Sequence, residues 1–333
     1  MAVPPLSCTP SRKTYRLADG GKPIELLVLR SIWSGPESLE PLLQQTVDAG
    51  FNGIEGPIPD SPTARREWQQ QLQDHNLAFI AEATTGSDKS DSGNWWIPKP
   101  ERSLQDHLDD LRWTIEYAAA MDALFVSAMT GYDAWSWQQN VDFFSQALEL
   151  QQQSGITISF ETHRSRSLFN PWITRDLLQQ FPQMQITCDF SHWCVVCERL
   201  IDSEWEILQL CASRARHIHS RVGFAQHAQV SEPRAPEYQA ALIAHERWWD
   251  LIWQSQKLRG LPRTTMTPEF LWDNYMSTLP FTQQPVADVW QITCWMAERQ
   301  RQRFAQLGKT KLGQTQVSQT PTNIVQPTEH SRD

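Results

Sequence analysis

Apolar and polar positions alternate in four short segments of the second half of the chain, at residues 156–161, 185–189, 215–219 and 264–269. Successive side chains of a strand point to opposite faces, so each segment predicts a strand with one apolar and one polar face. The last residue of each segment lies on the polar face. These four residues are Glu161, Asp189, His219 and Glu269.

Four apolar segments of strand length precede these, and a predicted helix follows each of the eight. The four earlier strands are expected at 24–32, 51–56, 77–82 and 123–129. Helices are expected at 37–49, 62–75, 103–121, 138–153, 171–180, 193–200, 203–211, 237–257 and 286–304. Eight strand-then-helix units in one alternation predict a parallel sheet that closes into a (β/α)8 barrel. A doubly wound open sheet is the alternative, but no glycine-rich phosphate loop follows the first strand.

The predicted fold class is therefore α/β, with a single (β/α)8 TIM barrel over residues 23–306. Residues 1–22 are expected to be irregular. Residues 307–333 are rich in Gln and Thr without apolar periodicity, which predicts a disordered C-terminal tail. The polar loop at 84–100 is long for a connection inside a compact domain, which favours a lid or a solvated insertion. The tryptophan-rich segment 245–253 is a candidate contact surface or a cover over the barrel mouth.

Composition narrows the function classes. The 333 residues carry a formal net charge of −9, which argues against nucleic acid as the main partner because phosphate binding needs clustered Lys and Arg. No run of about 18 apolar residues occurs, and residues 1–16 lack the apolar core of a signal peptide, so we expect no membrane partner and a cytoplasmic location. The six cysteines include one isolated Cys194-x-x-Cys197 pair and are expected to be reduced structural thiols. A homo-oligomer is compatible with such a barrel.

Consecutive strands of a barrel end side by side at its C-terminal rim, so Glu161, Asp189, His219 and Glu269 are expected to meet there. Three carboxylates and one imidazole suit Mn²⁺, Mg²⁺ or Co²⁺ better than a structural zinc, which favours Cys and His. The alternative is that each residue caps its own strand as an ordinary polar group. Four such residues in the same phase on successive strands favour the metal site.

Other polar residues flank these strand ends. His217 has the phase of His219 but lies one layer deeper, which favours a hydrogen-bonded interior histidine. His192 lies three residues past Asp189 and could bind substrate or a water molecule next to the ligands. Arg221 lies two residues past His219 on the same face, within reach of an anionic or hydroxyl-rich substrate. Weaker candidates are His163, Arg164, Glu55 and Arg30.

The motifs Phe160-Glu-Thr-His-Arg164, Thr187-Cys-Asp-Phe-Ser-His-Trp193, His217-Ile-His-Ser-Arg-Val-Gly223 and Pro268-Glu-Phe270 together resemble the xylose-isomerase-like TIM-barrel family. That family contains sugar (phosphate) isomerases and epimerases, dehydratases and endonuclease IV-type enzymes, and the resemblance covers nearly all of residues 24–306. It implies a divalent metal ion (Mn, Mg, Co or Zn) at Glu161, Asp189, His219 and Glu269, with His192 and Arg221 on the substrate. His163 and Glu55 are further substrate-binding candidates. By the same resemblance, Glu161 and Glu269 are the catalytic residues that move the proton from opposite faces of the substrate.

The resemblance predicts a metal-dependent sugar isomerase or epimerase that removes a proton next to a carbonyl through an enediolate. The expected partner is a small-molecule carbohydrate or polyol. A metal-dependent dehydratase (lyase) of a cyclic polyol ketone and a non-catalytic sugar-binding barrel stay open as alternatives. Endonuclease IV-type activity would need more histidine ligands and a basic groove, and neither is visible in the sequence.

Overall fold

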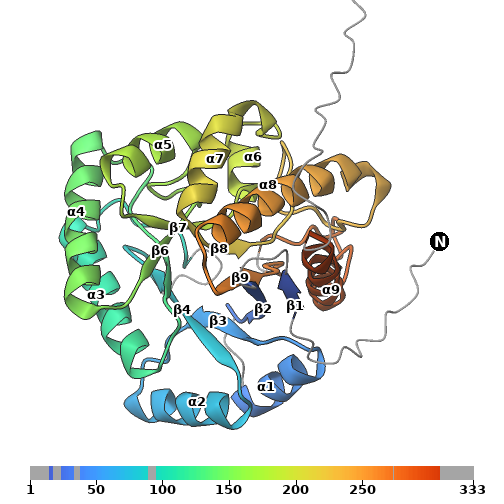
Figure 1. The fold of residues 1–333 in the computed structure, drawn as a ribbon, viewed down its shortest axis with the longest axis horizontal. Coiled ribbons are helices and arrows are strands. Elements are labelled where there is room, and N and C mark those ends of the chain that lie inside the picture. The colour runs from blue at the N-terminus through green and yellow to red at the C-terminus, as the bar shows by residue number, and fades with distance from the viewer. Residues whose placement is uncertain (1–14, 18–23, 34–37, 89–94, 273, 308–333) are drawn as a thin grey trace, which may run out of the picture.

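Eight parallel strands close into a barrel in the computed structural model, which describes residues 15–17, 24–33, 38–88, 95–272 and 274–307 (Figure 1). The strands follow the chain order around the barrel, and the last pairs with the first. They are β2 (Ile24–Ser31), β3 (Gly53–Pro57), β4 (Ala78–Thr84), β5 (Val126–Met129), β6 (Ile158–Glu161), β7 (Gln185–Cys188), β8 (Ala215–His219) and β9 (Arg263–Thr267). The predicted (β/α)8 barrel is confirmed.

Helices surround the strands on the outside of the barrel (Figure 1). They are α1 (Leu39–Asp48), α2 (Pro62–Asp74), α3 (Leu104–Ala120), α4 (Trp137–Ser154), α5 (Pro171–Gln180), α6 (Ser191–Val196), α7 (Trp205–Arg214), α8 (Gln239–Leu258) and α9 (Val289–Leu307), with short 3₁₀ turns at Asp202–Glu204 and Pro236–Tyr238. Local signals set several boundaries. Ser103 and Ser136 each form a capping box at the start of α3 and α4, and Gly155 ends α4 in the left-handed conformation.

The two faces of the barrel strands bury different kinds of side chain. The outward side chains, such as Ile54, Ile158 and Ile186, are completely buried against the helices in the main core. Inside the barrel, a small apolar cluster of Leu27, Leu29, Ile80 and Phe125 forms a separate layer.

A polar layer also lies inside the barrel. Ser127 Oγ is 3.1 Å from Thr187 Oγ1, which donates to Ser159 Oγ at 2.8 Å. His217 Nδ1 is 2.7 Å from Thr265 Oγ1 on the neighbouring strand. The alternation seen in the sequence therefore separates an interior with one apolar and one polar layer from the apolar shell between sheet and helices.

Three expectations are modified by the structure. The segment expected to be irregular contains β1 (Tyr15–Leu17), which pairs antiparallel with β2. The tryptophan-rich segment is core rather than surface or cover, because His245, Trp248, Trp249 and Trp253 are fully buried on α8. Leu307 ends α9, while the rest of the predicted tail (308–333) and part of the predicted lid (89–94) lie outside the described residues.

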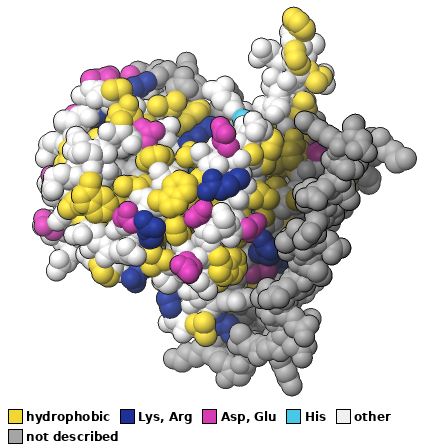
Figure 2. All heavy atoms as spheres, turned by 90° about the horizontal axis from the view of Figure 1, so that it is seen from above, with side chains coloured by type: hydrophobic (Ala, Val, Ile, Leu, Met, Phe, Trp, Pro, Cys, Tyr) yellow, Lys and Arg dark blue, Asp and Glu magenta, His cyan; other side chains and the backbone are white. Residues whose placement is uncertain are grey.

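No helix in the described part of the chain is long and apolar enough to cross a membrane. On the face drawn in Figure 2, Lys and Arg side chains are scattered among Asp and Glu rather than gathered into a continuous basic patch. Cys188, Cys194, Cys197 and Cys211 are free thiols.

Candidate metal centre

The four predicted ligands meet at the C-terminal ends of four consecutive strands. Glu161 ends β6, Asp189 follows β7, His219 ends β8, and Glu269 stands two residues after β9. One potential ligand atom from each lies within 4.8 Å of all the others. Parallel strands deliver these side chains to one rim, which is where such barrels place their chemistry.

Three atoms of this group are buried and form no hydrogen bond with any residue that the structure describes. They are Glu161 Oε1, Glu269 Oε2 and His219 Nδ1. His219 Nδ1 lies 3.4 Å from Glu161 Oε1 and 2.9 Å from Glu269 Oε2, so the three atoms face one another. Buried polar atoms that form no hydrogen bond are costly, and a shared cation would satisfy all three. The residues present therefore fit a divalent ion.

The charges around His219 lead to the same conclusion. Burial favours its neutral form, but Glu269, Glu55 and Glu161 outweigh burial and raise the pKa of the ring well above its ordinary value. The carboxylates thus favour a positive charge at this place, and a metal ion would supply it.

Glu55 lies beneath His219, on the side away from the other ligands. Its Oε1 is 3.0 Å from His219 Nε2, and its Oε2 is 2.9 Å from His217 Nε2. Burial alone would raise the pKa of Glu55, but the two histidines hold it well below its ordinary value. The structure therefore occupies both oxygens of this predicted substrate-binding residue with histidines, and it places His217 as the hydrogen-bonded interior histidine that the sequence predicts.

Arg221 contacts both Asp189 and Glu269 of the centre. Its Nη2 lies 2.5 Å from Asp189 Oδ2, 2.8 Å from His192 Nε2 and 3.1 Å from Glu269 Oε2. Ser191 Oγ donates to the other oxygen of Asp189 at 2.5 Å. Arg221 and His192 are thus both in the centre, and the charge of Arg221 is balanced by two carboxylates.

The two glutamates of the centre differ in electrostatic environment. Burial raises the pKa of Glu161 to about 7, although His219 opposes this. Burial also acts on Glu269, but Arg221 and His219 outweigh it and lower the pKa of this carboxyl. Trp33, just after β2, donates its indole N–H to Glu269 Oε1 at 2.6 Å.

His163 lies on the outer side of the centre. Its ring packs at a tilt of 46° against that of His192 with 3.8 Å between centroids, and its Nε2 is 3.4 Å from the hydroxyl of Tyr275. The guanidinium of Arg164 lies 5.0 Å from the Tyr275 ring. Arg30 is not in the centre, because it binds Leu42 O and Thr46 Oγ1 and packs over Trp290.

Aromatic side chains cover the centre. A cavity of about 20 Å³ remains among Trp33, Trp95, Trp96, Met129, His163, Arg221, Glu269, Leu271 and Tyr275. That space holds about one water molecule and is far too small for a sugar, so a sugar can enter only if covering side chains move. Sequence reasoning missed Trp33 and Tyr275, while the Trp95-Trp96 pair at the end of the polar loop was a visible signal.

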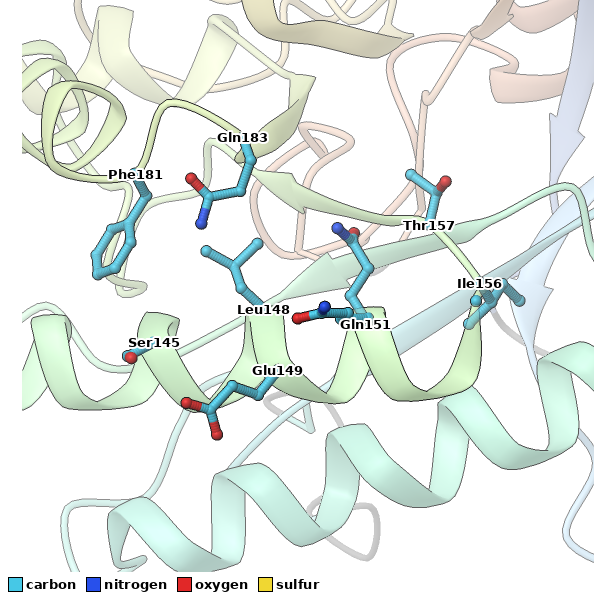
Figure 3. Close-up of a pocket in the computed structure, with 10 residues that line it drawn as sticks. Ser145, Leu148, Glu149, Gln151, Ile156, Thr157, Phe181 and Gln183 are labelled. Atoms are coloured by element: carbon cyan, nitrogen blue, oxygen red, sulfur yellow. The ribbon is translucent and has the colours of Figure 1, made fainter.

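A larger concavity, of about 570 Å³, lies at the other end of the barrel. Its residues come from α4 and from the segments that lead into β6 and β7, among them Glu149, Gln151, Thr157 and Gln183 (Figure 3). Size alone would favour this hollow, but the converging ligand-type side chains lie at the opposite rim.

Comparison with known proteins places this geometry in context. Residues 43–228, more than half of the chain, match the profile described as "Xylose isomerase-like TIM barrel". A search of curated proteins finds no match.

Three solved structures share the fold. The 3-keto-D-glucoside 4-epimerase from E. coli has a TM-score of 0.55 at 12% identity, covering 83% of this chain and 99% of its own. The IOLI protein with a bound zinc atom has a TM-score of 0.54 at 10% identity, covering 84% and 98%. The probable 3-DHS dehydratase from Bacillus anthracis has a TM-score of 0.50 at 16% identity, covering 81% and 97%. At these identities the likeness concerns the fold.

Proposed function

This chain belongs to the xylose isomerase-like TIM barrel family, and on that premise we propose that it is a divalent-metal-dependent sugar isomerase or epimerase. The observation that carries the proposal is the set of three buried atoms of Glu161, His219 and Glu269 that form no hydrogen bond with the described residues and face one another beside Asp189. The expected partner is a small carbohydrate or polyol. The free thiols of Cys188, Cys194, Cys197 and Cys211 support a reducing compartment such as the cytoplasm.

Glu161, Asp189, His219 and Glu269 would hold the ion, with Mn²⁺, Mg²⁺, Co²⁺ and Zn²⁺ as candidates. The ion would supply charge stabilisation for the enediolate that forms when a proton next to a carbonyl is removed. Glu55 orients His219 by holding Nε2, which leaves Nδ1 directed at the other ligands. We therefore assign Glu55 a positioning role in place of the predicted contact with substrate.

Glu161 and Glu269 move the proton in this proposal. They extend from β6 and from the end of β9, on either side of His219, which suits removal of a proton from one face of the substrate and its return to the other. Trp33 holds one oxygen of Glu269 and so limits its orientation. His192, Arg221 and His163 present nitrogen atoms on the outer side of the centre, where substrate hydroxyls would bind.

A dehydratase is the second candidate. It begins with the same proton removal, and the two reactions differ in whether a neighbouring hydroxyl then departs. The polar centre supports both reactions, and the shape of the opened pocket would decide between them.

Exchange of substrate hydrogen for deuterium tests the proposal directly. The Mn²⁺-loaded protein is incubated in D₂O with unphosphorylated ketoses and cyclic polyol ketones, and NMR follows the hydrogen next to each carbonyl. Exchange that is lost in both Glu161→Gln and Glu269→Gln supports the assignment, and a dehydratase would in addition release an unsaturated ketone. Exchange at the parent rate in either variant would contradict it.

A further inference from the structure

A fifth acidic side chain, Glu82, reaches the same interior. It stands near the end of β4 and pairs in register with Ser127 on β5. In-register neighbours on adjacent strands point to the same face, and Ser127 bonds to Thr187 across the barrel interior. Glu82 therefore points into the barrel, where it is 6% exposed.

Neither carboxyl oxygen of Glu82 has a hydrogen-bond partner among the described residues. Glu55, one strand away, is the matched contrast, because histidines bind both of its oxygens. A buried carboxyl group without a partner destabilises the fold. A protein is expected to retain such a destabilising carboxyl group only where the group gains a partner during function.

The strand register places Glu82 beside the candidate metal centre, because Glu55 pairs with Ile80 and Glu82 therefore lies one inward position nearer the C-terminal rim than Glu55. Burial raises its pKa well above the ordinary value, and the carboxylates of Glu55, Glu269 and Glu161 raise it further, while His219 opposes them. Glu82 does not belong to any group of ligand-type side chains whose atoms lie within 4.8 Å of one another in the described chain. It is close enough to feel the centre's charges but is not placed as a ligand.

We propose that Glu82 is a substrate-binding residue, whose carboxyl group forms hydrogen bonds with a hydroxyl group of the sugar or polyol bound at the metal centre. This inference rests on the proposed function. A hydroxyl group both donates and accepts a hydrogen bond, so it can satisfy a carboxyl group in either protonation state. An apolar substrate group at this place would leave both oxygens unpaired.

Two substitutions separate binding from structure. Glu82→Met keeps the length of the side chain and removes both oxygens, while Glu82→Gln keeps hydrogen bonding. Thr264→Val is the matched control, because Thr264 Oγ1 on β9 is also buried without a partner but lies outside the centre. Calorimetry measures the Kd of Mn²⁺, and of D-glucose, D-fructose and myo-inositol with and without Mn²⁺. Thermal unfolding gives the Tm of each variant.

We expect Glu82→Met and Thr264→Val both to raise the Tm, since each removes an unpaired buried polar group. Glu82→Met should weaken binding of whichever probe the parent binds by about tenfold or more, the size of a lost hydrogen bond to a buried carboxyl group. Glu82→Gln should recover part of that loss. In Glu82→Met and Glu82→Gln the Kd of Mn²⁺ should stay within about twofold of the parent value. Thr264→Val should leave every Kd unchanged.

Equal probe affinity in parent and Glu82→Met would overturn the proposal. So would an equal loss of Mn²⁺ affinity, which would make Glu82 a metal ligand. If the parent binds Mn²⁺ but none of the three probes, a sugar hydroxyl group is not the partner of Glu82 and the proposal is wrong. If the parent binds a probe but no metal, and Glu82→Met loses the probe, the role of Glu82 stands while the metal-dependent function falls.

Discussion

The indole nitrogen of Trp33 lies 2.6 Å from Oε1 of Glu269, and the opposite oxygen of that carboxylate faces His219 at 2.9 Å. One oxygen is thereby held by the segment that follows the barrel's first strand, and the other faces the centre. The hydrogen bond joins the two strands at which the barrel closes, because β2 pairs with β9.

Replacing Trp33 by Phe should weaken metal binding. The substitution keeps an aromatic ring but removes the donor to Glu269, and loss of such an outer partner typically costs about 10- to 100-fold in metal affinity. Trp95→Phe is the control, since Trp95 packs 4.8 Å from Trp33 in the same aromatic cover and makes no described contact with a candidate ligand. Calorimetric titration with Mn²⁺ measures both, and an equal Kd in the two variants would count against a role for the indole.

Glu55→Gln should lower both metal affinity and stability. The amide can accept a hydrogen bond from only one of the two histidines that Glu55 now binds, and it removes the negative charge behind His219. We expect a roughly tenfold or larger rise in the Kd of Mn²⁺ and a loss of about 2–4 kcal/mol in the free energy of unfolding. Glu25→Gln, at a half-exposed surface pair with Arg263, should change neither by more than about 0.5 kcal/mol. Unchanged metal affinity in Glu55→Gln would remove its positioning role.

Arg166→Met should loosen the aromatic cover. The fully buried guanidinium of Arg166 donates to the backbone carbonyls of Thr85, Trp96 and Gly131, and so ties the segments after β4 and β5 together. We expect a loss of about 2–4 kcal/mol in stability and faster amide exchange around Trp96. Arg166→Lys keeps the charge but loses the planar guanidinium group. Its stability and its amide exchange around Trp96 should therefore lie between those of the parent and of Arg166→Met. Exchange at the parent rate around Trp96 in Arg166→Met would show that other contacts hold the cover.

His107 should make the protein less stable in acid. Its ring is buried with Nδ1 2.8 Å from Thr85 Oγ1, and burial lowers its pKa to about 3 from an ordinary 6.5. Between these values the unfolded chain binds a proton that the folded protein does not, so stability is full above pH 6.5 and falls as the pH drops toward 3. The loss approaches roughly 3–5 kcal/mol.

His107→Asn tests this dependence, because asparagine can retain the bond to Thr85 without titrating. The free energy of unfolding is measured from pH 7.5 down to the lowest pH at which the parent is folded. We expect a shallower pH slope for the variant below about pH 6.5. Parallel slopes for parent and variant would contradict the assignment.

The strand ends were the most informative part of the sequence. Period-two alternation identified the polar face of each strand, and the barrel rule brought Glu161, Asp189, His219 and Glu269 to one rim. The same signal marks Glu82, which ends the strand predicted at 77–82, yet it was not singled out because nothing else in that segment suggests a ligand.

Other features depend on geometry that the sequence does not encode locally. Glu55 was recognised as a candidate, but its direction toward His217 and His219 depends on the stagger between strands on opposite sides of the barrel. Trp33 and Tyr275 lie in connections whose path is set by tertiary packing. The burial of Trp248 and Trp249 shows the same limit, since periodicity does not tell which side of a largely apolar helix faces the barrel.

Metal content tests the central claim most directly. The purified protein is saturated with Mn²⁺, freed of excess ion and analysed for metal, beside Glu161→Gln, Asp189→Asn and the distant control Glu25→Gln. The account predicts about one ion per chain in the parent and control, and loss of the ion in both site variants. A parent that holds no ion after saturation, or site variants that retain it in full, would contradict a metal centre at this rim.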